Sequence, residues 1–234
     1  MLIWIHEKQN MGKIKVLYIN FKNELQANEI ELLRGAVLNK LGDAPVLFHN
    51  HVGGNYRYAY PLIQYKRVRK KAAIVCIGEG VEVVGSLFAA GDFFFRLGNK
   101  DVQMEIESVK ANQVVVQLWD TEFTYQINRW LPLNEENYVA YQQLDSLMER
   151  CDFLQKKLTG NILSMAKGLG IHFEDLVQCR ILEIADSYMV TYKGIRMMAF
   201  NVTFKSNVSL PEYAGLGKGV SLGNGIIFKK TDKR

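Results

Sequence analysis

The sequence predicts an α+β protein built from two successive halves. Three observations support this prediction: strand-like and helix-like segments follow one another in a regular order up to about residue 109, the strand-like pattern starts again at Val114, and no Pro/Ser-rich linker or low-complexity tract interrupts the chain. The chain has 234 residues, 48% of them hydrophobic, which is enough for one large core or two small ones. We expect two compact domains, 1–112 and 113–234, that join near Asn112.

The first half has the clearer pattern. Residues 13–21 alternate and are rich in β-branched and aromatic side chains, which predicts a strand. Apolar residues then recur at helical spacing through 30–41, with Asn23 or Asn28 as N-cap and Gly42 as the helix end. The remaining expected elements are strands at 62–68 and 72–77, a short helix at 79–91, and a strand within 92–98 or 102–109. The order β-α-β-β-α-β is that of a ferredoxin-like unit.

The second half repeats this pattern less completely. Residues 114–127 predict a strand or a hairpin. Apolar residues spaced from Leu144 to Ile162 predict one long amphipathic helix, which Gly168 and Gly170 end. Strand-like segments follow at 180–184, 188–192, 197–204 and 225–230. Only one clear helix is expected in this half.

Composition narrows the class of protein. Lys and Arg number 29 against 24 Asp and Glu, so the formal charge is +5 and the distribution of charge matters more than its sum. Three scattered cysteines fit buried thiols in a reducing compartment rather than a disulfide framework or a zinc knuckle. No apolar run approaches the ~20 residues of a membrane span, and the first ten residues are too briefly apolar for a signal peptide. We expect a cytoplasmic protein with no membrane partner.

The segment from Pro45 to Lys71 has an unusual chemistry. No Asp or Glu occurs between Asp43 and Glu79, while the segment holds two histidines, several tyrosines and a basic cluster. The histidines are His49 and His51, the tyrosines include Tyr56 and Tyr58, and the basic cluster (66–71) contributes Lys66, Arg67, Arg69, Lys70 and Lys71. Cations without carboxylates suit a polyanion, tyrosines suit stacking on unpaired bases, and histidines can transfer protons near neutral pH. Together these features predict a ribonuclease that uses no metal.

Other interpretations of the histidine pair remain open. His49 and His51 lie two residues apart, so on a strand they would share one face and could chelate a metal. The segment offers no carboxylate as a third ligand, which disfavours a metal, and we expect no cofactor. The pair could also be two solvated loop histidines. Tyr60 and Tyr65 could belong to the core rather than to a binding surface.

Two further motifs indicate local structure rather than catalysis. The sequence GVSLG at Gly219–Gly223 matches a nucleophile elbow, but only eleven residues follow it and none is histidine, which excludes that site. Gly78 and Gly80 follow a predicted strand, but Val83 stands where a dinucleotide-binding fingerprint requires a small residue. We expect these two glycines to shape a tight turn between strand and helix.

The glycine-rich loop (Gly215–Gly225) has two compatible interpretations. It contains Gly215, Gly217, Lys218, Gly219, Gly223 and Gly225. A backbone with so little side-chain cover lets its N–H groups approach a phosphate. The same glycines could instead shape a kinked hairpin that leads into the last strand, with Asn224-Gly225 as its turn.

At this point the chain resembles a known family, the CRISPR-associated endoribonucleases that cut precursor CRISPR RNA within each repeat and belong to the RAMP superfamily. Three features carry the resemblance: the block YPLIQYKRVRKKAAIVCIGEG that follows the β-α-β-β start, the histidines and tyrosines just before this block, and the glycine-rich loop before the terminal strand. The resemblance covers both ends of the chain, whereas residues 114–193 match only in general layout.

The resemblance implies a fold, a reaction and a set of residues. It implies two tandem ferredoxin-like (RRM-like) domains and metal-independent cleavage that leaves a 2′,3′-cyclic phosphate and a 5′-hydroxyl. Catalytic positions of similar proteins correspond here to His49, His51 and Tyr58, and to Lys40 with one residue of slack. The expected RNA contacts are Tyr56, the five cations of the basic cluster, and the glycines and lysine of the glycine-rich loop.

The implied partner is CRISPR repeat RNA, and other CRISPR-associated proteins are a further class of partner that the resemblance allows. The protein would act as a monomer or a homodimer. Two rival functions stay open: a non-catalytic RAMP subunit that binds guide RNA in an effector complex, and a small-molecule enzyme that uses the Gly78–Gly80 turn.

Overall fold

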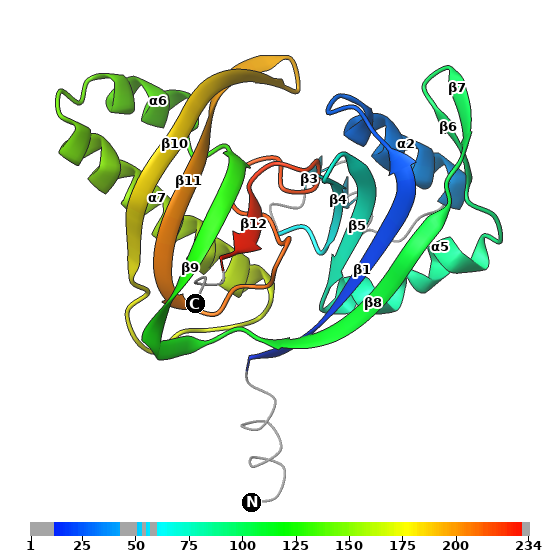
Figure 1. The fold of residues 1–234 in the computed structure, drawn as a ribbon, viewed down its shortest axis with the longest axis horizontal. Coiled ribbons are helices and arrows are strands. Elements are labelled where there is room, and N and C mark those ends of the chain that lie inside the picture. The colour runs from blue at the N-terminus through cyan, green and yellow to red at the C-terminus, as the bar shows by residue number, and fades with distance from the viewer. Residues whose placement is uncertain (1–11, 43–50, 53–54, 57–59, 231–234) are drawn as a thin grey trace, which may run out of the picture. The chain divides into compact units, whose positions relative to one another are not determined.

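The computed structural model describes residues 12–42, 51–52, 55–56 and 60–230, and Figure 1 shows their fold. The chain divides into two compact units. The N-terminal unit comprises Lys13–Val114 together with Ser221–Gly223. The C-terminal unit comprises Gly12, Val115–Val220 and the described residues from Asn224 onward. Each unit contains one four-stranded sheet.

The sheet of the N-terminal unit has the strand order β4-β5-β1-β8. Its strands are β1 (Lys13–Glu24), β4 (Ile63–Val68), β5 (Lys71–Ile77) and β8 (Ile106–Val115). β1 pairs antiparallel with β5, and β5 pairs antiparallel with β4. The first strand of the unit therefore lies between the third and the fourth, as a ferredoxin-like unit requires. The predicted fold of the first half is confirmed.

Helix α2 (Glu29–Leu41) packs on this sheet through one apolar face. Its buried residues Leu33 and Val37 belong to the same core cluster as Phe21 of β1, which is the result that the predicted helical spacing requires. Asn28 occupies the N-cap position, but its side chain makes no capping hydrogen bond. Gly42 ends the helix with φ of 58°, a conformation that glycine adopts without a steric penalty.

The segment after β5 differs from the prediction of a single helix at 79–91. It forms two short helices, α4 (Glu79–Val83) and α5 (Gly85–Ala89), that meet at Val84. Glycine is a poor residue for a helix interior, so Gly85 marks the break. Phenylalanine rings cluster beside the core on this side: the partly buried Phe93 lies 5.6 Å from the exposed Phe88 and 6.2 Å from the buried Phe95 between ring centroids.

Three strands form where one was expected. β6 (Phe94–Leu97) and β7 (Lys100–Gln103) make a two-stranded hairpin, and β8 joins the main sheet. Gly98 adopts φ of 62° in the hairpin turn. A second small hairpin pairs β2 (His51–Val52) with β3 (Asn55–Tyr56).

The C-terminal unit repeats the same strand order. Its strands are β9 (Leu118–Trp130), β10 (Cys179–Tyr192), β11 (Ile195–Val208) and β12 (Ile226–Lys229), in the order β10-β11-β9-β12. Two helices, α6 (Glu135–Gln142) and α7 (Leu147–Gly168), connect β9 to β10. Between β11 and β12 the structure describes every residue and contains no helix there. The glycine-rich loop occupies the place of the second helix of a ferredoxin-like unit.

β10 and β11 form one long hairpin instead of the three short strands expected between 180 and 204. Each strand has 14 residues. Lys193 and Gly194 make the turn, with φ of 50° and 77°. Two positive φ values in a two-residue loop are typical of a type I′ turn, whose twist matches that of the flanking strands.

Helix α7 begins at a capping box. The Ser146 side chain accepts a hydrogen bond from the Glu149 backbone N–H, and the Glu149 carboxylate accepts one from the Ser146 backbone N–H. Leu154 and Leu158 are fully buried, as the helical spacing predicts, whereas Leu147 is 72% exposed. None of the described helices is long and apolar enough to cross a membrane.

Candidate nucleic-acid interface

Part of the predicted catalytic set lies outside the described residues. His49 and Tyr58 belong to this part. The structure describes the backbone of His51 in β2, where it is the direct cross-strand partner of Tyr56 in β3. A predicted catalytic position and a predicted RNA-binding position are therefore neighbours in one hairpin.

Lys40 lies in the last turn of α2, and its amine is engaged in local contacts. The amine forms an ion pair with Asp92 and donates a hydrogen bond to the Phe94 carbonyl at 3.2 Å. It also lies 5.5 Å from the centroid of the Phe95 ring. The hydrogen bond from Lys40 holds the pKa of the Asp92 carboxyl below its ordinary value. These contacts tie the end of α2 to the start of β6.

The basic cluster does not present five cations on one surface. Lys66 is fully buried, because β4 alternates its side chains between two faces and both faces are covered at this position. Burial lowers the pKa of the Lys66 amine to about 7, since a buried charge loses its hydration. Arg67 is half-buried, and its Nε donates to the Leu25 carbonyl at 2.6 Å.

The other cations of the cluster lie at the β4–β5 turn. Arg69 and Lys70 are exposed and make the turn with φ of 49° and 69°. Lys71 forms an ion pair with Glu107 of β8 at 2.6 Å. Of the five predicted RNA contacts in the cluster, Arg69 and Lys70 are the pair that the structure brings together at an exposed position.

The glycine-rich loop is closed by its own backbone and by β9. Leu216 donates its N–H to the Gly225 carbonyl at 2.9 Å, and Gly225 donates to the Arg129 carbonyl at 2.9 Å. Asn224 is buried within the loop, where its Oδ1 accepts a hydrogen bond from Arg129 Nε at 2.7 Å and its Nδ2 donates to the Gly219 carbonyl at 3.3 Å. These bonds hold the loop as an ordered hairpin.

Most glycines of the loop are required by the space around them. Gly217, Gly219, Gly223 and Gly225 all have positive φ. At Gly225 a Cβ atom would lie 1.9 Å from the Leu216 carbonyl oxygen, and at Gly217 it would lie 2.9 Å from the Leu131 carbonyl oxygen. Gly215, Gly223 and Gly225 are buried, whereas Lys218 is exposed. The kinked hairpin therefore accounts for these glycines, and Lys218 is the residue of the loop that presents a charge to solvent.

Three residues of the loop belong to the N-terminal unit. Tyr65 of β4 donates its backbone N–H to the Ser221 carbonyl at 3.0 Å, and Tyr65 and Leu222 form a parallel bridge. A Cβ atom on Gly223 would lie 2.9 Å from Ile30 Cδ1 of α2. Ser221–Gly223 thus extend the edge of the sheet beside β4, next to the buried Lys66.

The motifs set aside at the sequence level behave as expected. Residues 219–223 lie in the hairpin loop, not at a turn from strand to helix, so no nucleophile elbow forms. Gly78 adopts φ of 58° at the end of β5, and a Cβ on Gly80 would lie 2.5 Å from the Leu62 carbonyl oxygen. The positive φ accounts for Gly78, and close packing accounts for Gly80. Within the described part of the chain, no three His, Cys, Asp or Glu side chains are grouped so that they could hold a metal ion.

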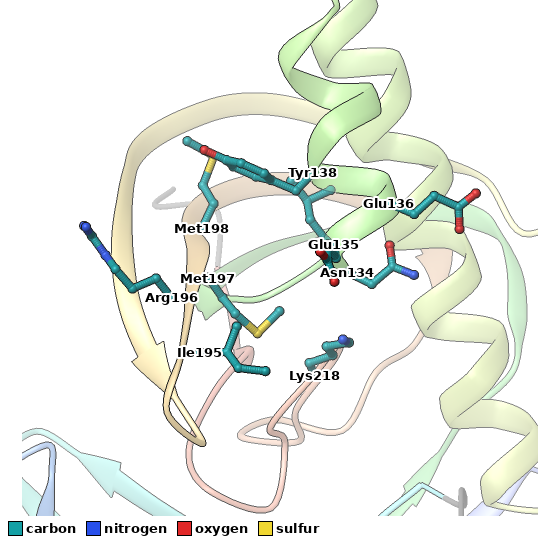
Figure 2. A pocket seen from close by; sticks show the side chains of 10 residues that line it. Asn134, Glu135, Glu136, Tyr138, Ile195, Arg196, Met197, Met198 and Lys218 are labelled. Carbon is teal, nitrogen blue, oxygen red and sulfur yellow. The ribbon is translucent and has the colours of Figure 1, made fainter.

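The C-terminal unit contains a pocket that the sequence did not reveal. This α6 pocket has a volume of about 1000 Å³ and lies between the start of α6, the start of β11 and the glycine-rich loop (Figure 2). Tyr138 and Met197 line it, together with Lys218. Of these three residues only Lys218 was a predicted site residue. Tyr138 lies in α6, a second helix where the sequence predicted only one, and Met197 lies in an expected strand, and neither segment gave a signal of a site.

Comparisons with known proteins cover nearly the whole chain. A family model described as the Cas6b N-terminal domain matches residues 12–115, and one described as the Cas6b C-terminal domain matches residues 117–230. A curated protein of Methanocaldococcus jannaschii, described as uncharacterized, is 39% identical over 103 residues, which are 44% of this chain and 69% of that protein.

Solved structures agree with this assignment. A crystal structure of Cas6b matches with a TM-score of 0.86 and 28% identity over 93% of this chain and 100% of that chain. A crystal structure of the CRISPR RNA processing endoribonuclease Cas6b matches with a TM-score of 0.73, with the same identity and coverage. Csf5, a type IV Cas6 crRNA endonuclease, shares the fold at a TM-score of 0.58 and 13% identity, over 94% of this chain and 100% of that chain. The resemblance stated from the sequence is confirmed: the chain belongs to the Cas6b family.

Proposed function

We propose that this protein is an endoribonuclease that cuts CRISPR repeat RNA during the processing of CRISPR RNA. The observation that carries the proposal is the match of both Cas6b domain models to consecutive parts of the chain. The similar crystal structure of a CRISPR RNA processing endoribonuclease Cas6b, with a TM-score of 0.73, supports it. Repeat RNA is the proposed substrate.

The proposed reaction is a metal-independent transesterification within the RNA. The 2′-hydroxyl oxygen attacks the adjacent phosphorus, which forms a 2′,3′-cyclic phosphate and breaks the bond to the 5′-oxygen of the next nucleotide. His51 takes the proton from the 2′-hydroxyl, and His49 or Tyr58 donates a proton to the leaving 5′-oxygen. An imidazole titrates near ~6.5, which suits this exchange at neutral pH.

Lys40 offsets negative charge on the phosphorane in this proposal. Its amine is ion-paired with Asp92 and bonded to the Phe94 carbonyl. These partners compete with a phosphate for the ammonium charge, which makes Asp92 a useful test of the role.

RNA binding in the proposal uses Tyr56, the basic cluster and the glycine-rich loop. Arg69, Lys70 and Lys218 are exposed and therefore suit contacts with phosphates. The buried Lys66 and the buried glycines of the loop act by shaping the surface on which the RNA lies.

A cleavage assay in EDTA separates this function from its rivals. The purified protein is incubated with end-labelled repeat RNA, transcribed from a CRISPR array of the source genome, and the products are mapped. We expect cleavage at one position and a 2′,3′-cyclic phosphate end. Binding without cleavage would instead indicate a non-catalytic RNA-binding subunit. If the protein neither binds nor cleaves the RNA, both functions are contradicted.

A further inference from the structure

The walls of the α6 pocket suit a flat aromatic ligand. Tyr138 and Met198 both line it, and in Figure 2 Met197 points into the pocket. Leu133 is buried and adds to the apolar lining. Thioethers pack favourably against aromatic rings, and a tyrosine ring can stack on a nucleobase of any sequence. These groups leave a mostly apolar space with one aromatic wall.

A small number of charged groups meet at the same pocket. Glu135 and Glu136, in the first turn of α6, and Lys218, in the glycine-rich loop, line it, and in Figure 2 the Glu136 carboxylate is directed away from the other two. Arg196 lies at the rim, with its guanidinium directed away from the pocket in Figure 2. A carboxylate accepts hydrogen bonds from the N–H groups of a base, whereas a lysine amine pairs with a phosphate. The two charges thus favour opposite ends of one nucleotide.

We propose that the α6 pocket binds one unpaired nucleobase of the RNA substrate, with its ring against Tyr138 and Met197 and a neighbouring phosphate on Lys218. This inference rests on the proposed function, which makes RNA the substrate. The position of Lys218 supports this inference. Lys218 is exposed and lines the pocket, so an RNA strand that contacts its amine already lies at the edge of the pocket. Glu135 repels phosphates, so the base and not the backbone enters.

The occupant favoured here is RNA rather than a protein segment, because the lining joins one aromatic wall to charged side chains of both signs. An apolar helix of a partner would leave Glu135 and Lys218 without complementary groups. An unpaired nucleotide offers both a donor edge and a phosphate.

The test measures two quantities separately: the affinity of the protein for RNA, and the direct contact of the RNA with the pocket. Two variants change the pocket, Tyr138→Leu and Met197→Gln, and Val139→Ala is the matched control because Val139 is an exposed neighbour on α6 that does not line the pocket. The Kd for repeat RNA is measured in EDTA, and the single-turnover cleavage rate is measured at saturating RNA. In parallel, repeat RNA carrying 4-thiouridine is crosslinked to the wild-type protein, and the crosslinked peptides are mapped.

We expect Tyr138→Leu to raise the Kd about tenfold, as the loss of one stacked base predicts. The saturated cleavage rate should change little, since the pocket positions RNA and does not touch the reacting atoms. Val139→Ala should bind as the wild type does. The crosslink should map to peptides containing α6 or the start of β11, a contact that does not depend on how well a variant folds.

The outcomes distinguish this inference from the proposed function. If the wild type cleaves the RNA, both pocket variants keep its affinity and no crosslink maps to α6 or β11, the proposed role of the pocket is contradicted and the nuclease function is not. Binding and crosslinking without cleavage would support the pocket and contradict the nuclease. A wild-type protein that does not bind repeat RNA would contradict both.

Discussion

The Cα atom of Gly225 faces the backbone of Leu216 so closely that a Cβ atom there would lie 1.9 Å from the Leu216 carbonyl oxygen. Gly225 also has φ of 64°, and its N–H donates to the Arg129 carbonyl. This contact joins the two arms of the glycine-rich loop. It makes the loop a packed element whose shape depends on the absence of a side chain.

Gly225→Ala should therefore destabilise the protein. The left-handed backbone and the clash with Leu216 together predict a loss of at least about 2 kcal/mol in the free energy of unfolding. The matched control is Gly160→Ala in α7, where an added Cβ meets nothing within 4 Å beyond its own helix. The control should gain about 0.5–1 kcal/mol, because alanine favours a helix over glycine. Urea unfolding measures both, and equal stabilities in the two variants would contradict the packed loop.

Lys66 should make stability depend on pH just above neutrality. Its folded pKa of about 7 lies below the ordinary lysine value of 10.5. Between these values the unfolded chain binds more protons, so the free energy of unfolding should rise with pH, by at most about 1 kcal/mol per pH unit. Lys66→Met should remove this slope between pH 7 and 8.5.

The window ends at pH 8.5 because another group acts in the opposite direction. Burial raises the pKa of the Cys76 thiol to about 12, so at higher pH the unfolded chain loses that proton first, which offsets the rise in stability that Lys66 causes. Urea unfolding of the wild type and of Lys66→Met at several pH values within the window measures the difference. Parallel curves would show that Lys66 does not titrate there.

Arg69 and Lys70 should account for part of the salt dependence of RNA binding. Both are exposed at the β4–β5 turn. Each contact with a phosphate of single-stranded RNA contributes a slope of about −0.7 to a plot of log K against log salt. The double variant Arg69→Glu/Lys70→Glu should flatten the slope by about 1.4. Lys66→Met is the control, because a buried amine makes no contact with phosphate and its removal should leave the slope unchanged.

Variants of Lys40 and Asp92 distinguish a catalytic role of Lys40 from a structural one. If Lys40 offsets charge at the phosphate, Lys40→Ala should lower the saturated cleavage rate at least about tenfold. Asp92→Asn frees the amine from its carboxylate partner and should leave the rate within about threefold. If both variants lose the same cleavage rate and the same thermal stability, the ion pair instead has a structural role and holds α2 against β6.

The elements of the fold were predictable where periodicity is local. Strand β1 and helix α2 each bury one periodic apolar face, and the ends of α2 at Asn28 and Gly42 follow from residue type. The break at Val84 and the β6–β7 hairpin were not predicted, because short apolar runs fit either helix or strand.

The candidate site was less predictable, because burial depends on residues distant in the sequence. In the sequence Lys66 belongs to a basic cluster that is expected to be exposed, yet both faces of β4 are covered at that position. Residues 221–223, which belong to the same unit, follow Lys66 by more than 150 positions in the sequence. Tyr138 and Met197 meet at the α6 pocket only because β9, β11 and the glycine-rich loop bring their segments together. No local pattern carries that information.

The central claim, metal-independent cleavage of repeat RNA by the histidine pair, is tested most directly by one comparison. The wild type, His51→Ala and the double variant His49→Ala/His51→Ala are each incubated in EDTA with saturating labelled repeat RNA under single-turnover conditions. We predict that the wild type cuts at one position to leave a 2′,3′-cyclic phosphate, and that His51→Ala lowers the rate about 10²–10⁴-fold while RNA affinity is largely retained. Full activity of the double variant, or a wild-type enzyme that EDTA inactivates, would contradict the claim.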